Sequence, residues 1–173
     1  MFRVKGLIFI LMAMINTAMA QLNSPKSEYV CTIDVLIDPT LVVGESVHGV
    51  RRIIPIIGGT IEGPNIKGTI LNGGADWQNI RKDGVAEIEA RYQFKTDDGS
   101  LIYIKNAGMR IASPEIAAKI ASGELVEPSL YYFRTVLQFE APIGKYDWLN
   151  KAIFICTAER KAKSVRIYVW KLL

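Results

Sequence analysis

The chain has 173 residues, half of them hydrophobic, which is enough for one domain with a sizeable core and too few for two. Its formal net charge is +4 at pH 7, from 21 basic and 17 acidic side chains. No run of lysine and arginine with interleaved aromatic residues is present, so the composition argues against a nucleic-acid partner.

The N-terminal residues have the pattern of an export signal. Arg3 and Lys5 form a short basic region, residues 6–13 are almost wholly apolar, and Ala18-Met19-Ala20 offers small residues for cleavage after Ala20. A membrane anchor is the alternative, but polar residues at 16 and 17 break the apolar run. That run is shorter than the roughly 20 residues of a spanning helix. We expect residues 21–173 to form one mature domain that is periplasmic or secreted, with no stable membrane insertion.

The first strands are expected at 29–37 and 50–57. Residues 29–37 alternate between apolar and polar side chains, and Asp38-Pro39 ends the run. Pro55 places the second strand at a sheet edge or at a bulge, because proline cannot donate a ladder hydrogen bond. Six glycines then crowd residues 58–74. No helix pattern follows them, so they predict bulges and bends rather than a phosphate loop.

A three-stranded antiparallel meander is expected over residues 76–106. Two Asp-Gly turns, at 83–84 and 98–99, separate β-prone runs at 77–80, 85–96 and 101–105. Such turns favour hairpins because glycine tolerates the positive φ that they need. The middle run alternates between an apolar set and a charged or polar set. One face of this strand must therefore be buried.

One helix follows the meander, and further strands follow the helix. Ser113 is the expected N-cap, Pro114 the first helical residue and Gly123 the terminator. Strands are expected at 129–140, 152–159 and 164–172. The fold prediction is all-β, a closed antiparallel up-and-down barrel of about eight strands with one short helix. A β-sandwich is the second choice.

Two cysteines, Cys31 and Cys156, lie in strand-like runs near the two ends of the mature chain. In an oxidising compartment they could form a disulfide. The alternative is two buried free thiols that pack as small hydrophobic groups. The sequence leaves both readings open.

The central span, residues 51–150, contains short motifs whose order and spacing are specific. They are GGTIEGP at 58–64, GGADW at 73–77, DGVAE at 83–87, ARY at 90–92, TDDG at 96–99, YYFRT at 131–135 and WLN at 148–150. In these motifs the chain resembles domain of unknown function 3237, a family of small bacterial and fungal β-barrel proteins. The resemblance implies a closed antiparallel barrel of lipocalin-like or allene-oxide-cyclase-like appearance. It implies no settled activity and assigns no catalytic residue.

A barrel of eight strands can hold one small ligand, so inward-facing polar residues are the candidate site residues. A buried Arg134 would need a carboxylate or an anionic ligand, and an ion pair within the protein is the alternative. Arg91 belongs to the charged face of the middle meander strand, which binds ligand only if that face lines the lumen. The commoner arrangement places it in water.

Two carboxylates and four aromatic residues complete the candidates. Glu62 and Asp76 sit beside glycine bends, where a carboxylate could act in proton transfer. For Asp76, capping a turn is the simpler role. The aromatic residues that could wall a pocket, or simply pack in the core, are Trp77, Tyr103, Tyr132 and Trp148.

These residues support two main functions. The first is an exported soluble barrel that binds a small organic molecule in its lumen, anchored by Arg134. The second is a cofactor-independent isomerase, cyclase or lactone hydrolase, with Glu62 or Asp76 as the proton-transfer group and Arg134 stabilising negative charge. An outer-membrane barrel is a third alternative. We expect no cofactor and no metal, and we leave a homo-oligomer open.

Overall fold

The computed structural model describes residues 24–173. The expected export signal, residues 1–20, lies outside the described residues. Within residues 24–173, no helix is long and apolar enough to cross a membrane.

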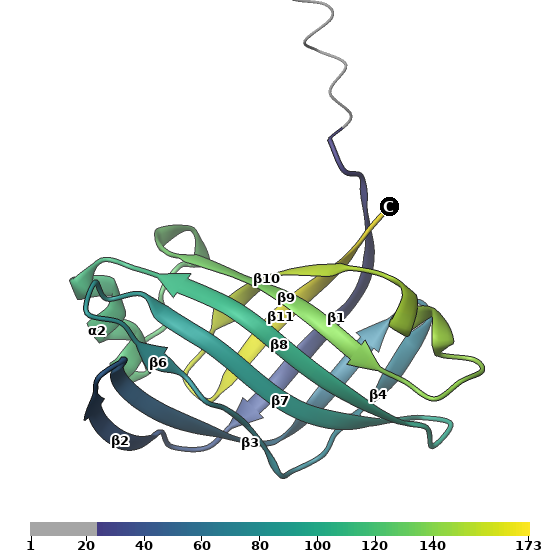
Figure 1. The fold of residues 1–173 in the computed structure, drawn as a ribbon, viewed down its shortest axis with the longest axis horizontal. Helices are drawn as coiled ribbons and strands as arrows, with labels where there is room; N and C mark the ends of the chain where they lie inside the picture. The colour runs from purple at the N-terminus through teal and green to yellow at the C-terminus, as the bar shows by residue number, and fades with distance from the viewer. Residues whose placement is uncertain (1–23) are drawn as a thin grey trace, which may run out of the picture.

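The described chain forms a closed antiparallel β-barrel with eight strand positions, which confirms the predicted fold (Figure 1). Around the barrel the strands follow the order β1, β11, β10, β9, β8, β7, β4 and β3, and β3 pairs with β1 to close it. Short strands β5 and β6 share the position of β4, between β3 and β7, while β2 extends β3 as a hairpin. The strand bounds are β1 Ser27–Ile37, β2 Leu41–Ser46, β3 Gly49–Gly63, β4 Ile66–Ile70, β5 Gly74–Asp76, β6 Asn79–Ile80, β7 Ala86–Thr96, β8 Leu101–Ile111, β9 Tyr132–Glu140, β10 Phe154–Arg160 and β11 Ser164–Leu172.

Strands β7 and β8 form the hairpin that the sequence predicts for the second and third strands of the meander. The strands pair from Ala86 opposite Arg110 to Lys95 opposite Leu101. On β7 the apolar set is buried and the set that contains Glu87, Glu89 and Arg91 faces outward, so the charged face lies in water. A lipid-facing strand needs the opposite arrangement. Strand β8 continues to Ile111, six residues beyond its predicted end.

Strand β3 is longer than the predicted 50–57 because it bends instead of ending at the glycines. Leu36 of β1 pairs with Gly58, but the next residue, Ile37, pairs with Ile56. The pairing register therefore shifts between these two positions. Gly58 and Gly59 have φ angles of +154° and +135°, which side chains rarely tolerate. A Cβ on Gly59 would also lie 2.0 Å from the Asp34 carbonyl oxygen. These glycines therefore let one strand turn the corner of the barrel, as predicted.

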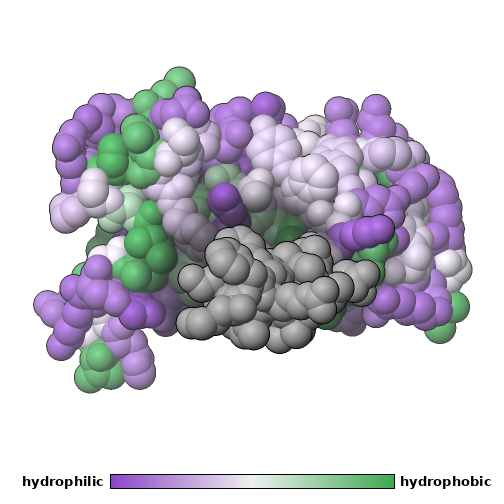
Figure 2. Space-filling view, turned by 90° about the horizontal axis from the view of Figure 1, so that it is seen from above, coloured by the Kyte–Doolittle hydropathy of each residue, from purple (hydrophilic) through white to green (hydrophobic). Residues whose placement is uncertain are grey.

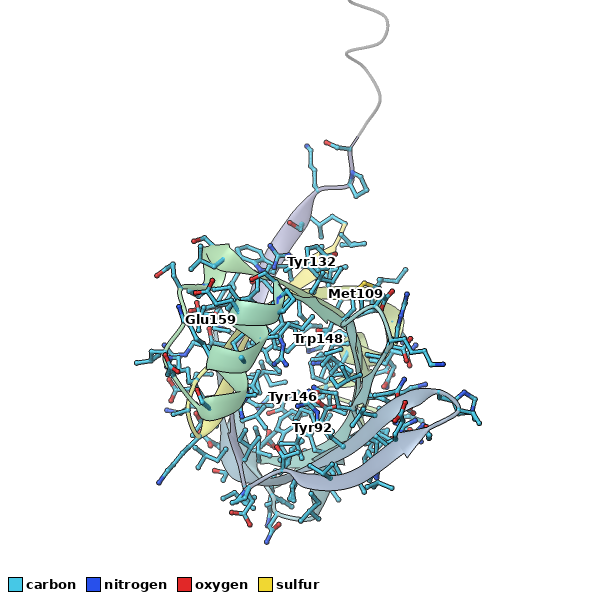
Figure 3. All side chains as sticks on the ribbon, turned by 90° about the vertical axis from the view of Figure 1, so that its left-hand side faces the viewer. Tyr92, Met109, Tyr132, Tyr146, Trp148 and Glu159 are labelled. Carbon is cyan, nitrogen blue, oxygen red and sulfur yellow. The ribbon has the colours of Figure 1, made fainter. Side chains whose placement is uncertain are left out.

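Helix α2, Pro114–Ser122, lies at one end of the barrel (Figure 3). The Ser113 side chain accepts a hydrogen bond from the Ile116 backbone N–H, and Gly123 ends the helix in the left-handed conformation. Both caps are as predicted from the sequence. Two single 3₁₀ turns, Pro128–Leu130 and Asp147–Lys151, complete the structure.

The two cysteines are buried free thiols. Cys31 of β1 and Cys156 of β10 both lie opposite Val169 of β11, so one strand separates them. Two strand spacings amount to about 9.6 Å between Cα atoms. A disulfide requires less than about 7 Å. The structure therefore has the second alternative, two buried free thiols.

Candidate functional site

The barrel lumen is hollow on one side of Tyr92 and packed with hydrocarbon on the other. A cavity of about 50 Å³ lies inside the barrel, and its wall is mostly aliphatic. Its polar lining residues are Asp76, Tyr92 and Asn106. Fully buried side chains that do not line the cavity fill the rest of the interior; the largest are Phe94, Phe154, Ile33, Ile61, Ile102 and Ile104. Figure 3 looks along the barrel from the α2 end and shows Tyr92 inside the ring of strands.

Asp76 faces the lumen because of its pairing register. It lies opposite Ile54 of β3 and Ala90 of β7, and both of these line the cavity. The Glu89 backbone N–H donates to Asp76 Oδ1 at 3.0 Å, and Gln78 Nε2 donates to Oδ2 at 3.2 Å. Burial raises the pKa of Asp76 to about 6, against the lowering effect of these hydrogen bonds and of two arginines. The carboxyl group therefore titrates close to neutral pH.

Three arginines from three strands surround this end of the lumen. Arg52 precedes the cavity-lining Ile54 on β3, Arg110 follows Asn106 on β8, and Arg160 follows Ala158 on β10, each on the inward face. Burial lowers the pKa of all three side chains, and that of Arg110 falls to about 10. Arg52 and Arg160 also lower the pKa of Arg110, because like charges repel its protonated form.

The three guanidinium groups differ in what they bind. Arg52 Nη2 donates to Gln78 Oε1 at 2.8 Å, while its buried Nε has no acceptor among the described residues. Arg160 donates to the backbone carbonyls of Lys161 and Ser164 in the turn between β10 and β11. Arg110 lies over the Phe133 ring, with its Cζ 5.9 Å from the ring centroid. Neither a salt bridge nor a hydrogen bond of its guanidinium is found within residues 24–173.

Two further polar atoms at the cavity have no partner within the described chain. They are the Tyr92 hydroxyl and Asn106 Oδ1, on side chains that are 1% and 3% exposed. Burial raises the pKa of Tyr92 well above its ordinary value, so the phenol stays protonated and can donate. An unpaired buried polar atom is costly, and ligand sites are places where such atoms persist.

A surface groove of about 240 Å³ leads from this end of the lumen to solvent. Arg52, Arg110 and Ala86 line it, together with Ala117 of α2. On β3, Arg52 is the inward residue next to Ile54, which lines the cavity. On β7, Ala86 has the same relation to Ile88. The groove and the cavity are therefore neighbours, with Arg52 and Arg110 at the junction. Figure 2 shows the surface hollowed at the α2 end, with hydrophobic side chains among hydrophilic ones.

Of the predicted proton-transfer residues, Asp76 reaches the lumen and Glu62 does not. The Glu62 side chain is exposed on the outside of β3, with an Oε1 to Lys67 Nζ distance of 3.8 Å. The expectation that Arg134 anchors a ligand in the lumen is wrong, because its side chain lies outside the barrel. Arg134 and Tyr132 are exposed outside β9, where the Arg134 Cζ lies 5.2 Å from the Tyr132 ring centroid. The inward residues of β9 are the ones that alternate with them.

The other predicted ligand contacts also lie off the lumen. Arg91 faces water and pairs with Glu89 at 2.7 Å, which is the commoner arrangement stated above. Trp77 is 37% exposed in the segment between β5 and β6, and Tyr103 lines an outer groove. Trp148 is half-buried on the 3₁₀ turn Asp147–Lys151, where it packs against Phe154 with ring centroids 6.3 Å apart and lines a separate surface groove. The structure brings none of these four residues to Asp76.

Sequence reasoning missed the arginines, although one signal was present. The inward set of β8 continues as Ile102, Ile104, Asn106, Gly108 and Arg110. The predicted strand ends at residue 105, so Asn106, Gly108 and Arg110 fell outside it. Arg52 and Arg160 gave no comparable signal, because each adjoins another basic residue, Arg51 or Lys161, and such pairs are typical of exposed positions. In the described part of the chain, no group of three or more metal-ligating side chains is present.

A family model described as "Protein of unknown function (DUF3237)" matches residues 25–172. The chain belongs to this family. An UPF0311 protein of Rhodopseudomonas palustris is 45% identical over 148 residues, which are 86% of this chain and 97% of that protein. A conserved protein of unknown function from the same species has a crystal structure with a TM-score of 0.83 and 42% identity, covering 87% of this chain and 99% of its own.

The DUF3237 barrel recurs in another bacterial structure and in a fungal relative. A "beta-barrel like protein" from Acinetobacter baumannii has a TM-score of 0.74 and 41% identity, covering 88% of this chain and all of its own. A hydroalkoxylation enzyme of Penicillium herquei is 25% identical over 126 residues, 73% of this chain and 69% of that enzyme. The crystal structure of an enzyme from the same fungus has a TM-score of 0.67 at 20% identity, which shows a shared fold. The same barrel is therefore found in relatives of unknown function and in a distant relative that is named an enzyme.

Proposed function

We propose that the protein is a cofactor-independent enzyme that transfers a proton on a small organic substrate at the α2 end of the lumen, with Asp76 as the proton-transfer group. One observation carries this proposal. Within residues 24–173, Asp76 is the only carboxylate that lines the cavity, and it lies half-buried beside three arginines. A carboxyl group that is partly shielded from water and has a pKa near neutrality is suited to accept and return a proton at physiological pH.

The arginines suit a reaction in which negative charge develops on the substrate. Preorganised cations at a water-poor site stabilise such charge more strongly than bulk water does. Among the isomerase, cyclase and lactone hydrolase reactions predicted above, cyclisation by addition of a hydroxyl group to a conjugated C=C bond fits best. The distant relative that is named a hydroalkoxylation enzyme supports this choice, since hydroalkoxylation adds an O–H bond across a C=C bond.

The step balances without a cofactor. Ionised Asp76 takes the hydroxyl proton while the oxygen bonds to the β-carbon of an unsaturated carbonyl compound. The electron pair of the C=C bond forms a new double bond between the α-carbon and the carbonyl carbon, the π pair of the carbonyl group moves to its oxygen, and the arginines stabilise the enolate that forms. Asp76 then returns the proton to the α-carbon, so that one C–O bond and one C–H bond replace the π bond and the O–H bond.

Short ω-hydroxy-α,β-unsaturated esters test this proposal in deuterium oxide. The expected result is a cyclic ether that carries deuterium at the α-carbon, detected by mass spectrometry. Asp76→Asn should lower kcat about a hundredfold or more, because it removes the proton-transfer group and keeps the shape. Glu62→Gln is the matched control and should keep full activity, because Glu62 is exposed outside the barrel. Equal activity of Asp76→Asn and the natural protein would refute the proposal.

Binding without turnover is the other proposed function. The hydrogen bonds that Gln78 and Glu89 donate to Asp76 favour it, because they could give this carboxylate a purely structural role. In that case a ligand binds in the lumen and no substrate of the panel reacts. Export from the cytoplasm, to the periplasm or the medium, stays a prediction from residues 1–20.

A further inference from the structure

We propose that the Arg110 guanidinium binds a carboxylate group, so that the natural substrates or ligands of this site are small organic acids whose apolar part enters the lumen. This inference rests on the site proposed above, because it uses the same cavity and the same groove. It adds the chemical class of the molecule that the site receives.

Arg110 lacks a partner among the described residues. Its side chain comes from the inward face of β8, at the junction of the groove and the cavity. The described residues offer it a place over the Phe133 ring but no carboxylate and no hydrogen-bond acceptor. A partly buried guanidinium without an acceptor is unfavourable, and an anionic ligand would supply the missing acceptor.

The free donors at this end of the barrel suit a carboxylate. Arg52 donates to Gln78 through Nη2, and Arg160 donates to the carbonyls of Lys161 and Ser164 through Nη1. Arg110 is the one of the three arginines whose whole guanidinium has no acceptor within residues 24–173. Its fork matches the two oxygens of one carboxylate in a bidentate pair. The single charge of a carboxylate also matches one wholly free guanidinium better than a phosphate dianion does.

The local charge also favours an anionic ligand. Three arginines and one aspartate meet at this end of the barrel, which leaves an excess of two positive charges when Asp76 is ionised. Nearby groups that could reduce this excess are neutral, namely Gln78 on the Arg52 side and the Tyr131 hydroxyl, which accepts from the Arg160 backbone N–H at 2.9 Å. A monoanionic ligand lowers the mutual repulsion of the arginines.

The space beyond Arg110 suits the apolar part of an organic acid. The cavity is lined by aliphatic side chains from β1, β3, β7 and β11, and Tyr92 closes it toward the filled half. Its volume of about 50 Å³ admits only a short apolar chain. An acid of this kind would place its carboxylate at the groove and its hydrocarbon part inside the barrel, next to Asp76.

Isothermal titration calorimetry with hexanoate tests the inference. The natural protein should bind hexanoate, and it should bind hexanol and hexyl phosphate more weakly. Arg110→Met should lower the hexanoate affinity roughly tenfold to hundredfold, the effect of losing a hydrogen-bonded charge pair. Arg134→Met removes an exposed arginine from the outer face and should leave the affinity unchanged. Circular dichroism and thermal melting of both variants verify that they are folded.

Each other outcome overturns the inference. Equal binding of hexanoate and hexanol would show that the carboxylate is not recognised, and tighter binding of hexyl phosphate would assign the site to phosphate esters. Unchanged affinity in a folded Arg110→Met variant would remove Arg110 as the anchor. The proposed enzyme is judged separately by the Asp76→Asn variant on neutral esters. Cyclisation of esters without hexanoate binding would overturn this inference alone.

Discussion

Asp76 and Asn106 lie on either side of Ala90 in one cross-strand row. Asp76 of β5 is opposite Ala90 of β7, and Ala90 is opposite Asn106 of β8. All three line the cavity, and the small Ala90 side chain leaves open space between the two polar ones. This row explains why the lumen is hollow at this level, since a larger residue on β7 would fill it.

Ala90→Leu should therefore close the cavity and abolish hexanoate binding. The added methyl groups occupy the space beside Asp76, and overpacking lowers the free energy of unfolding by about 1–3 kcal/mol. Calorimetry measures the binding, and thermal melting measures the stability. Ala107→Leu, at the half-buried neighbouring position on the opposite face of β8, is the control and should bind normally. Normal binding by Ala90→Leu would place the ligand elsewhere.

The activity of the proposed enzyme should rise with pH through about 6. At that pH Asp76 loses its proton and becomes the base that the proposed step needs. The pH profile of kcat/KM for an ester substrate measures this change. A profile that is flat between pH 5 and 8 would contradict the assignment of Asp76 as the base.

The same ionisation should lower stability. The folded-state pKa of Asp76 lies above the unfolded value of 3.8, so the folded protein holds this proton over a range where the unfolded chain has lost it. Stability from this group is therefore full below pH 3.8 and is lost as the pH rises to about 6. The loss amounts to roughly 3 kcal/mol. Asp76→Asn should remove this dependence. In urea unfolding, the free energy of unfolding of the variant, relative to that of the natural protein, should therefore be higher at pH 8 than at pH 4.

Arg110→Met should raise the stability of the ligand-free protein. The substitution exchanges a partly buried charge without an acceptor for an apolar side chain of similar length, a change that adds about 1–3 kcal/mol in comparable cases. For a chain of this size that is a rise in Tm of a few degrees, about 2–4 °C per kcal/mol. Arg166→Met is the contrast, because Arg166 pairs with Asp34 at 2.8 Å and should bring no gain. A lower Tm for Arg110→Met would mean that Arg110 has a partner within the protein.

Cys31 and Cys156 should stay reduced in the folded protein. One strand separates them, and burial raises the pKa of each thiol to about 12, so neither reacts readily. A thiol reagent should label both cysteines only after unfolding, and a reductant should leave the Tm unchanged. An intact mass two hydrogens lighter than the reduced chain would contradict this prediction.

Local sequence rules determined much of the architecture. The Asp-Gly turns and the alternation of residues 85–96 specify the β7–β8 hairpin, since turn geometry and a two-residue period depend only on neighbours in sequence. The caps of α2 and the bend at Gly58 and Gly59 follow from local chemistry in the same way. These patterns were sufficient for a closed barrel, and Asp76 emerged as a candidate because it follows a glycine pair.

Only the tertiary structure decided which polar residues share the lumen. Arg52, Arg110 and Arg160 are far apart in sequence and meet because closure of the barrel brings β3, β8 and β10 around one end. Alternation separates the two faces of a strand but does not identify the inner face where both contain polar residues, so the sequence pointed to Arg134 and not to Arg110. The spacing of the two cysteines likewise depends on strand β11, which enters between them from the other end of the chain.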